Sequence, residues 1–139
     1  MSSLGALIET IAVYKELDVT KQLWKQGKKL VDGINGIAKE YGIEENFYIE
    51  GAACSPNYVT KDSAGNVSNE FRTLFQQEMI KNGVVMSCIS MCYEHRDEEI
   101  EFALEAIRKT LKTYRNAMES GVDKFLEDRA IKPVFRKYN

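Results

Sequence analysis

A chain of 139 residues with 44% apolar and 29% charged residues is typical of one soluble globular domain. Nineteen basic and 21 acidic residues give a net charge of -2, so there is no electrostatic reason to expect a nucleic acid or a membrane surface as partner. No apolar run approaches the roughly 18 to 20 residues that span a bilayer.

The N-terminus and the cysteines bear on the cellular compartment. The first residues, MSSLGALIETIAVYKELD, lack the basic region and the cleavage site of a signal peptide. Three cysteines at irregular spacing favour reduced thiols over a disulfide framework. We therefore expect a cytoplasmic protein with a single domain, residues 1–139.

Helical periodicity dominates the first third of the chain. Apolar residues at helical spacing predict a first helix over residues 3–17, which begins abruptly, as if another segment preceded it. Asp18 is the predicted N-cap of a second helix that ends at Gly42. Three glycines inside this helix lower its intrinsic propensity and are expected to allow close packing. These glycines are Gly27, Gly33 and Gly36.

Short strands and a third helix follow. Residues 47–51 and 57–61 are predicted strands, separated from the next element by turn-forming residues. Ser68 is the predicted N-cap of a helix over residues 69–82, with Phe71, Leu74, Phe75 and Ile80 on its buried face and Met79 alongside. An Asn-Gly pair at residues 82–83 provides a C-terminal stop.

The last part of the chain is predicted to hold two further strands and one long helix. Residues 84–86 and 89–93 are strand-like, and Asp97 is the predicted N-cap of a helix that runs to about Met118. Beyond Gly121 the tail is only partly helical. This order of elements predicts an α+β fold, in which helices cover a small antiparallel or mixed sheet.

The stretch MCYEHRDEEI, residues 91–100, contains the chain's single histidine, His95. Cys88 and Cys92 are four residues apart in a predicted strand, so they would share a face at about 13 Å from each other. One zinc ion holds its thiolates at about 2.3 Å and cannot bind both without a bend. We interpret the cysteines as buried thiols in a core strand and expect no metal site.

Residue chemistry alone also predicts no catalytic site. A catalytic Cys-His pair needs side chains within hydrogen-bond reach, whereas Cys92 and His95 would lie on opposite strand faces. Cys54 could meet the histidine only through the fold. The carboxylates of Glu94 and residues 97–99 are expected to cap the last helix and to face solvent. The segment AGNVSNE lacks the glycine pattern and the lysine of a phosphate-binding loop.

Several stretches, taken in order, resemble the C-terminal small domain of class III pyridoxal-phosphate (PLP) aminotransferases, in particular the glutamate-1-semialdehyde 2,1-aminomutase-like branch. LGALIETIAVYKELDVTKQLWKQGKKLVDGINGIAKEYGI resembles the family's passage from the large into the small domain. EFRTLFQQEMIKNGVVM is similar to a helix that leads through a GV turn to a strand. ISMCYEHRDEEIEFALEAIRKTL resembles the "S.AHT.EDI..TLEA" signature, which places His95 at the strand exit, and KPVFRKYN is similar to a family C-terminus.

The resemblance implies a fold type I enzyme that works as a homo-oligomer, usually a dimer. PLP would form a Schiff base with a lysine of a large domain upstream of Met1. Residues 1–17 would be the helix that connects this missing large domain to the small one. The chain alone would bind no PLP and transfer no amino group. In the intact enzyme it would contribute to dimer contacts and shape the substrate mouth, with Ser87 and Cys88 nearest to the substrate.

Two departures from the family pattern bear on the substrate. The stretch CISMCYEH lacks the arginine with which many members clamp a substrate carboxylate, which favours an aminomutase-like or sugar-type branch. The same stretch is shorter than in the typical aminomutase. An alternative from another class is a stand-alone binding or interaction module that reuses this fold. A stand-alone module predicts a buried apolar face on the first helix, whereas an exposed face favours the enzyme fragment.

Overall fold

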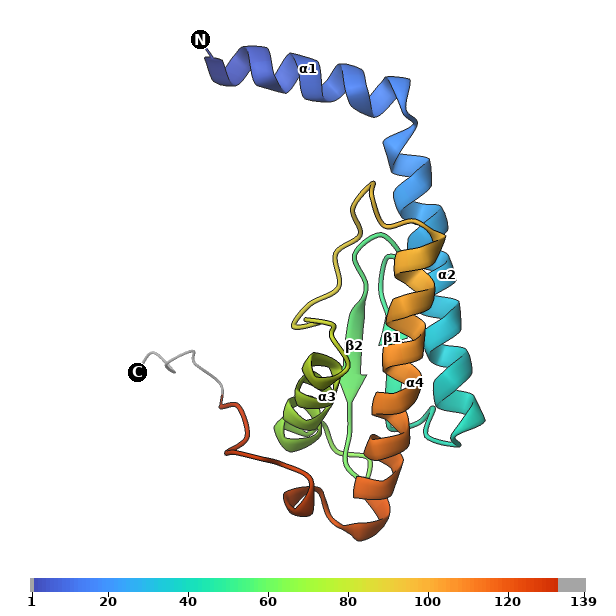
Figure 1. Ribbon diagram of the computed structural model, residues 1–139, viewed down its shortest axis with the longest axis vertical. Helices are drawn as coiled ribbons and strands as arrows, with labels where there is room; N and C mark the ends of the chain where they lie inside the picture. The colour runs from blue at the N-terminus through green and yellow to red at the C-terminus, as the bar shows by residue number, and fades with distance from the viewer. Residues whose placement is uncertain (1, 133–139) are drawn as a thin grey trace.

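The structure, a computed structural model, describes residues 2–132 and has an α+β fold, as the sequence predicts. Two long helices lie side by side next to a short sheet, and a third helix packs on the same core (Figure 1). A short 3-10 helix follows the last α-helix. The elements are α1 Ser2–Glu16, α2 Val19–Glu40, β1 Phe47–Glu50, β2 Asn57–Thr60, α3 Asn69–Lys81, α4 Asp97–Ser120 and η1 Val122–Lys124.

Aromatic side chains fill the centre of the fold. Strands β1 and β2 pair antiparallel, with Phe47 opposite Thr60. The Phe47 ring packs on Phe75 of α3, with ring centroids 4.9 Å apart, and on Tyr114 of α4 at 5.6 Å. Tyr58 of β2 packs on the same Phe75 ring at 4.8 Å. These contacts hold the sheet, α3 and α4 together around one hydrophobic core.

Helix α3 follows its predicted boundaries closely. The Ser68 hydroxyl accepts a hydrogen bond from the Phe71 N–H at 3.2 Å, so the predicted N-cap is confirmed. Gly83 has a φ of 83°, the left-handed conformation that favours glycine after a helix. The buried face differs by one residue, because Met79 is fully buried whereas Ile80 is 59% exposed.

At two of the three glycines of α2, another part of the chain lies close to the helix backbone. A Cβ on Gly27 would overlap the backbone carbonyl of Ala53, and a Cβ on Gly33 would meet the Leu104 side chain of α4. No atom lies within 4 Å of the equivalent position on Gly36. The packing expected for this helix is therefore confirmed at Gly27 and Gly33, but not at Gly36.

The two predicted aspartate caps have different outcomes. Asp18 occupies the N-cap position of α2, as predicted, but it has a left-handed φ of 47° and its side chain forms no capping hydrogen bond. Asp97 is the first residue of α4, while Arg96 occupies the N-cap position. The Arg96 N–H donates instead to Glu99 Oε2 at 2.9 Å. Asp97, Glu98 and Glu99 lie in the first turn of α4, where carboxylates interact favourably with the helix dipole.

The two predicted strands after α3 are wrong for the part of the chain that the structure describes. Residues 84–86 and 89–92 have no regular secondary structure, a bend lies at residues 87–88, and Tyr93 begins a turn. Met86, Ile89 and Met91 nevertheless turn inward and are buried. An alternating apolar pattern specifies extended backbone, whereas a strand also needs a hydrogen-bonded neighbour.

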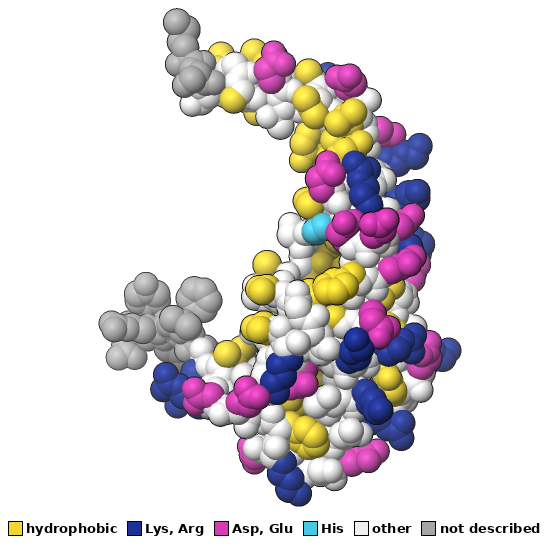
Figure 2. Space-filling model, in the orientation of Figure 1, with side chains coloured by type: hydrophobic (Ala, Val, Ile, Leu, Met, Phe, Trp, Pro, Cys, Tyr) yellow, Lys and Arg dark blue, Asp and Glu magenta, His cyan; other side chains and the backbone are white. Residues whose placement is uncertain are grey.

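Helix α1 forms as predicted and projects away from the rest of the chain (Figure 1). Apolar side chains run along its surface in Figure 2, and Leu4, Ile8 and Tyr14 are 64%, 58% and 48% exposed. In the single chain, the apolar face of α1 is thus uncovered. None of the described helices combines the length and the apolar character needed to cross a membrane.

Candidate functional site

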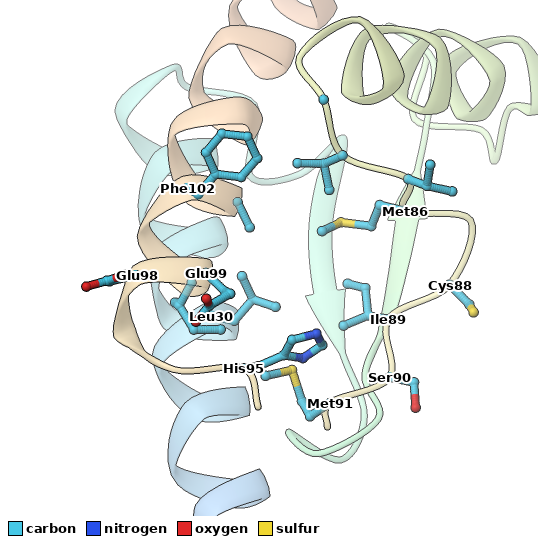
Figure 3. A pocket seen from close by; sticks show the side chains of 15 residues that line it. Leu30, Met86, Cys88, Ile89, Ser90, Met91, His95, Glu98, Glu99 and Phe102 are labelled. Carbon is cyan, nitrogen blue, oxygen red and sulfur yellow. The ribbon is translucent and has the colours of Figure 1, made fainter. Parts of the chain in front are cut away.

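A cleft of about 720 Å³ lies between the extended segment after α3 and the first half of α4 (Figure 3). Its size is within the range of small-molecule sites. One wall is formed by residues 83–86 and 88–91, and the other by His95 and by residues 98–100, 102 and 103. Leu30 of α2 closes the space between the two walls.

The extended wall is anchored at three points. The Val84 N–H donates to the Met79 carbonyl at 2.9 Å, and the Met91 N–H donates to the Cys54 carbonyl at 3.1 Å. Between them, the Tyr58 hydroxyl lies 3.2 Å and 3.1 Å from the carbonyl oxygens of residues 86 and 87. Tyr58 therefore positions the wall, a role that the sequence analysis does not predict.

Tyr58 is itself held in place by α3. Its hydroxyl accepts a hydrogen bond from Gln76 Nε2 at 2.8 Å, and the Arg72 guanidinium lies over its ring at 4.3 Å. Because the tyrosine is almost completely buried, its orientation is fixed by these contacts. Helix α3 thus sets the position of the cleft wall through one side chain.

The two substrate-mouth candidates lie next to each other on this wall. Cys88 lines the cleft, but its thiol points away from Leu30 and Phe102 (Figure 3). Ser87 is exposed and is not part of the lining. The interpretation of the cysteines as buried core thiols is wrong, because Cys88 and Cys92 are exposed and Cys54 is half-buried. The predicted core strand is a surface segment, which exposes their side chains.

His95 and Cys92 are brought together by a turn rather than separated on two strand faces. The His95 Nδ1 accepts a hydrogen bond from the Cys92 N–H at 3.2 Å, and the His95 N–H donates to the Cys92 carbonyl at 3.1 Å. The neutral imidazole consequently carries its proton on Nε2. These contacts use the backbone of Cys92, so they do not activate its thiol.

Among the described residues, the lining of the cleft contains no lysine and no arginine. It is mostly apolar, with Cys88, His95, Glu98 and Glu99 as its ionisable side chains. The nearby Lys29 is bound outside the cleft, because its amine contacts Asp97 at 3.1 Å and Glu101 at 3.0 Å. Hydrogen bonds to these two carboxylates raise the pKa of Lys29, and the Lys29 contact lowers the pKa of Asp97.

Neither a metal nor PLP fits the residues present. Among residues 2–132, no three His, Cys, Asp or Glu side chains lie close enough together to hold a metal ion. The cleft lining contains no lysine that could form a Schiff base with PLP, and no arginine that could bind its phosphate. The described arrangement can bind an apolar group beside acidic and imidazole side chains, but it lacks the groups that hold PLP.

Comparison with known proteins identifies the origin of this fold. The chain is 31% identical over 111 residues to a 3-aminobutyryl-CoA aminotransferase of Cloacimonas acidaminovorans (strain Evry), a match that covers 76% of this chain and 26% of the relative. The fold of this chain matches the structure of the PLP internal aldimine form of Sphingopyxis sp. MTA144 FumI protein, with a TM-score of 0.68. The two sequences are 19% identical, and the match covers 81% of this chain and 27% of the FumI chain. The chain corresponds to a C-terminal piece of a PLP aminotransferase.

This aminotransferase piece spans about a quarter of the length of either relative. No protein-family model matches the chain. The resemblance predicted from the sequence is confirmed for PLP aminotransferases as a group, and the α+β fold is confirmed by the FumI structure.

Proposed function

We propose that the chain is the C-terminal domain of a class III, glutamate-1-semialdehyde aminomutase-like aminotransferase and that it shapes the mouth of the substrate site. The cleft carries this proposal, because it is built from the VVMSCIS stretch in which the resemblance implies substrate contact. Ser87 and Cys88 are the substrate-mouth candidates. In the intact enzyme, a homo-oligomer, the domain also contributes to dimer contacts, and the enzyme works in the cytoplasm.

PLP would supply the electron sink for amino transfer, and another part of the polypeptide would hold it. This division of roles is supported by the cleft itself, which offers neither a lysine amine nor a basic group for the phosphate. The chain's own residues then act by shape, since the apolar walls around Met86, Ile89 and Phe102 exclude water from the mouth. The 139 residues alone bind no PLP and are inactive.

The substrate of the intact enzyme is one that needs no arginine clamp from this domain. The sequence CISMCYEH has no arginine, and the whole described lining of the cleft contains neither arginine nor lysine. The acidic side chains of Glu98 and Glu99 would also repel a distal substrate carboxylate. Both observations support an aminomutase-like or sugar-type substrate over a dicarboxylate such as 2-oxoglutarate.

The alternative function is a stand-alone interaction module. It predicts that a partner or a second copy covers the face formed by Leu4, Leu7, Ile8, Ile11 and Tyr14. These side chains are between 46% and 64% exposed in the single chain. Because finished monomers rarely expose a contiguous apolar surface, the exposed face supports the fragment of a larger enzyme.

The amount of PLP that the protein retains after dialysis tests the proposed division of roles. The 139-residue chain, saturated with PLP and dialysed, should retain none by mass spectrometry, whereas a longer polypeptide that includes the upstream domain should retain about one equivalent per subunit. Surface lysines that react reversibly with PLP release it on dialysis, and a urea-unfolded sample is the control for them. One equivalent retained by the folded 139-residue chain alone would contradict the proposal.

A further inference from the structure

His95 projects a polar ring into a largely apolar part of the cleft. In Figure 3 the ring extends from the loop before α4 toward Ile89, on the side of the cleft where Leu30 and Met91 also lie. The side chains of these three apolar residues are buried, whereas His95 itself is half-buried. The imidazole is therefore placed where a molecule bound in the cleft can reach it.

The turn before α4 determines which atom the imidazole offers to such a molecule. The Cys92 N–H donates to His95 Nδ1 at 3.2 Å, and the His95 N–H donates back to the Cys92 carbonyl at 3.1 Å. Because Nδ1 acts as an acceptor, the neutral ring carries its proton on Nε2. Among residues 2–132, no group accepts a hydrogen bond from this Nε2–H. His95 thus presents a hydrogen-bond donor that the described chain does not use.

The charges of the lining favour a neutral acceptor over an anionic one. Glu98 and Glu99 lie on the α4 side of the cleft, and the described lining contains neither lysine nor arginine. A carboxylate or phosphate bound here would face like charges without a basic partner. A neutral carbonyl oxygen can accept the hydrogen bond from Nε2 without this repulsion, and the apolar walls favour a carbon chain attached to it.

We infer that the cleft binds a small molecule in which a neutral carbonyl group is joined to an apolar chain. The carbonyl oxygen accepts a hydrogen bond from His95 Nε2, and the chain lies between Phe102 and the wall around Met86. This inference deepens the proposed function and rests on it for the origin of the ligand, which is part of the substrate of the intact enzyme. The binding itself needs only the residues of this chain.

Nuclear magnetic resonance of the imidazole nitrogens tests this inference, because His95 is the single histidine of the chain and its signals need no assignment. The probe is methyl butyl ketone, which has a neutral carbonyl group and no hydrogen-bond donor. Its titration should shift the Nε2 signal until saturation, with a Kd on the order of millimolar for so small a ligand. Hexanoate, which has the same number of carbons and a negative charge, should bind at least about tenfold more weakly.

Variants of the two walls separate the hydrogen bond from the apolar contact. His95→Asn removes the Nε2 donor, while its amide oxygen can still accept the Cys92 N–H, so ketone binding should weaken at least about fivefold with an unchanged circular dichroism spectrum. Phe102→Ala removes part of the apolar wall at a side chain that is 58% exposed, and should weaken binding about threefold. Ile80→Ala, at a side chain of α3 that is 59% exposed and outside the cleft, is the matched control and should change nothing.

The inference is overturned if the ketone produces no saturable shift of the Nε2 signal, or if hexanoate binds as tightly as the ketone. Ketone binding that His95→Asn leaves unchanged overturns it as well. All of these measurements use the 139-residue chain without PLP. A failure here is therefore distinguishable from a failure of the proposed function, which is tested by the PLP that the longer polypeptide retains.

Discussion

Tyr114 of α4 exchanges two hydrogen bonds with the backbone of Lys61. Its hydroxyl donates to the Lys61 carbonyl at 2.7 Å and accepts from the Lys61 N–H at 3.0 Å. This contact joins the long helix to the residue that directly follows β2. The Tyr114 side chain is fully buried. The Lys61 N–H also donates to the Asn46 carbonyl at 2.8 Å, so the Lys61 carbonyl is the backbone group that depends on this hydroxyl.

Tyr114→Phe should therefore destabilise the chain by about 1–3 kcal/mol, because it leaves the Lys61 carbonyl without its hydrogen-bond donor. Urea unfolding followed by circular dichroism measures the change. Tyr14→Phe, on the exposed α1 helix, is the matched control and should change the free energy of unfolding by less than about 0.5 kcal/mol. An equal loss in both variants would show that the contact with Lys61 contributes nothing.

The same tyrosine predicts an alkaline pH dependence. Burial raises the pKa of Tyr114 far above its ordinary value of 10.0. Above about pH 10 the unfolded chain releases this proton while the folded chain retains it, so the free energy of unfolding falls as the pH rises. Below that pH both states are protonated, and the contribution is constant. Tyr114→Phe should flatten the decline between about pH 9 and 11, and an unchanged slope would contradict this assignment.

Gly27 and Gly36 lie in the same helix but should respond in opposite ways to alanine. Gly27→Ala places a methyl group against the Ala53 carbonyl and should cost about 1–3 kcal/mol. Gly36→Ala meets open space and should stabilise the chain by about 0.5–1 kcal/mol through helix propensity. Thermal and urea unfolding measure the change in the free energy of unfolding of both variants. Stabilisation by Gly27→Ala would mean that α2 does not approach the β1–β2 loop this closely.

Two isoleucines test whether α1 contributes to the stability of the isolated chain. Ile107 of α4 is fully buried and Ile107→Ala should cost about 2–5 kcal/mol. Ile11 of α1 is 46% exposed, and Ile11→Ala should cost less than about 0.5 kcal/mol at low protein concentration. A large loss at Ile11 would show that this face is already covered in solution, as the stand-alone module requires.

The cysteines provide a direct probe of the cleft wall. Cys88 and Cys92 are exposed and Cys54 is half-buried, so a thiol reagent should modify two cysteines of the folded chain quickly and the third more slowly. Mass spectrometry of tryptic peptides assigns the sites, and the unfolded chain, in which all three react alike, is the control. Slow modification of Cys88 would indicate that its thiol is buried, as in the core strand predicted from the sequence.

Local sequence signals were sufficient wherever the interaction that they require lies within the chain. Ser68 capped α3 as predicted, because the cap needs only the amide of Phe71 three residues later. The long helix predicted up to about Met118 is found as α4, and it packs on elements of the same chain through the buried Ile107, Leu111 and Tyr114.

The failures have a common physical cause. The strands expected at residues 84–86 and 89–93 need a pairing neighbour, and the part of the chain that the structure describes offers none. The placement of Cys88 failed with them, because its predicted burial depended on that pairing. The role of Tyr58 was missed because its hydroxyl acts on residues almost thirty positions away, at a distance that no local pattern encodes.

The most direct test of the account is to read the coding DNA immediately upstream of the Met1 codon. The account predicts an uninterrupted reading frame that encodes a larger domain with the PLP-binding lysine, since this chain spans about a quarter of its relatives. An in-frame stop codon just before Met1, with a separate start site, would contradict it and would favour a free-standing interaction module.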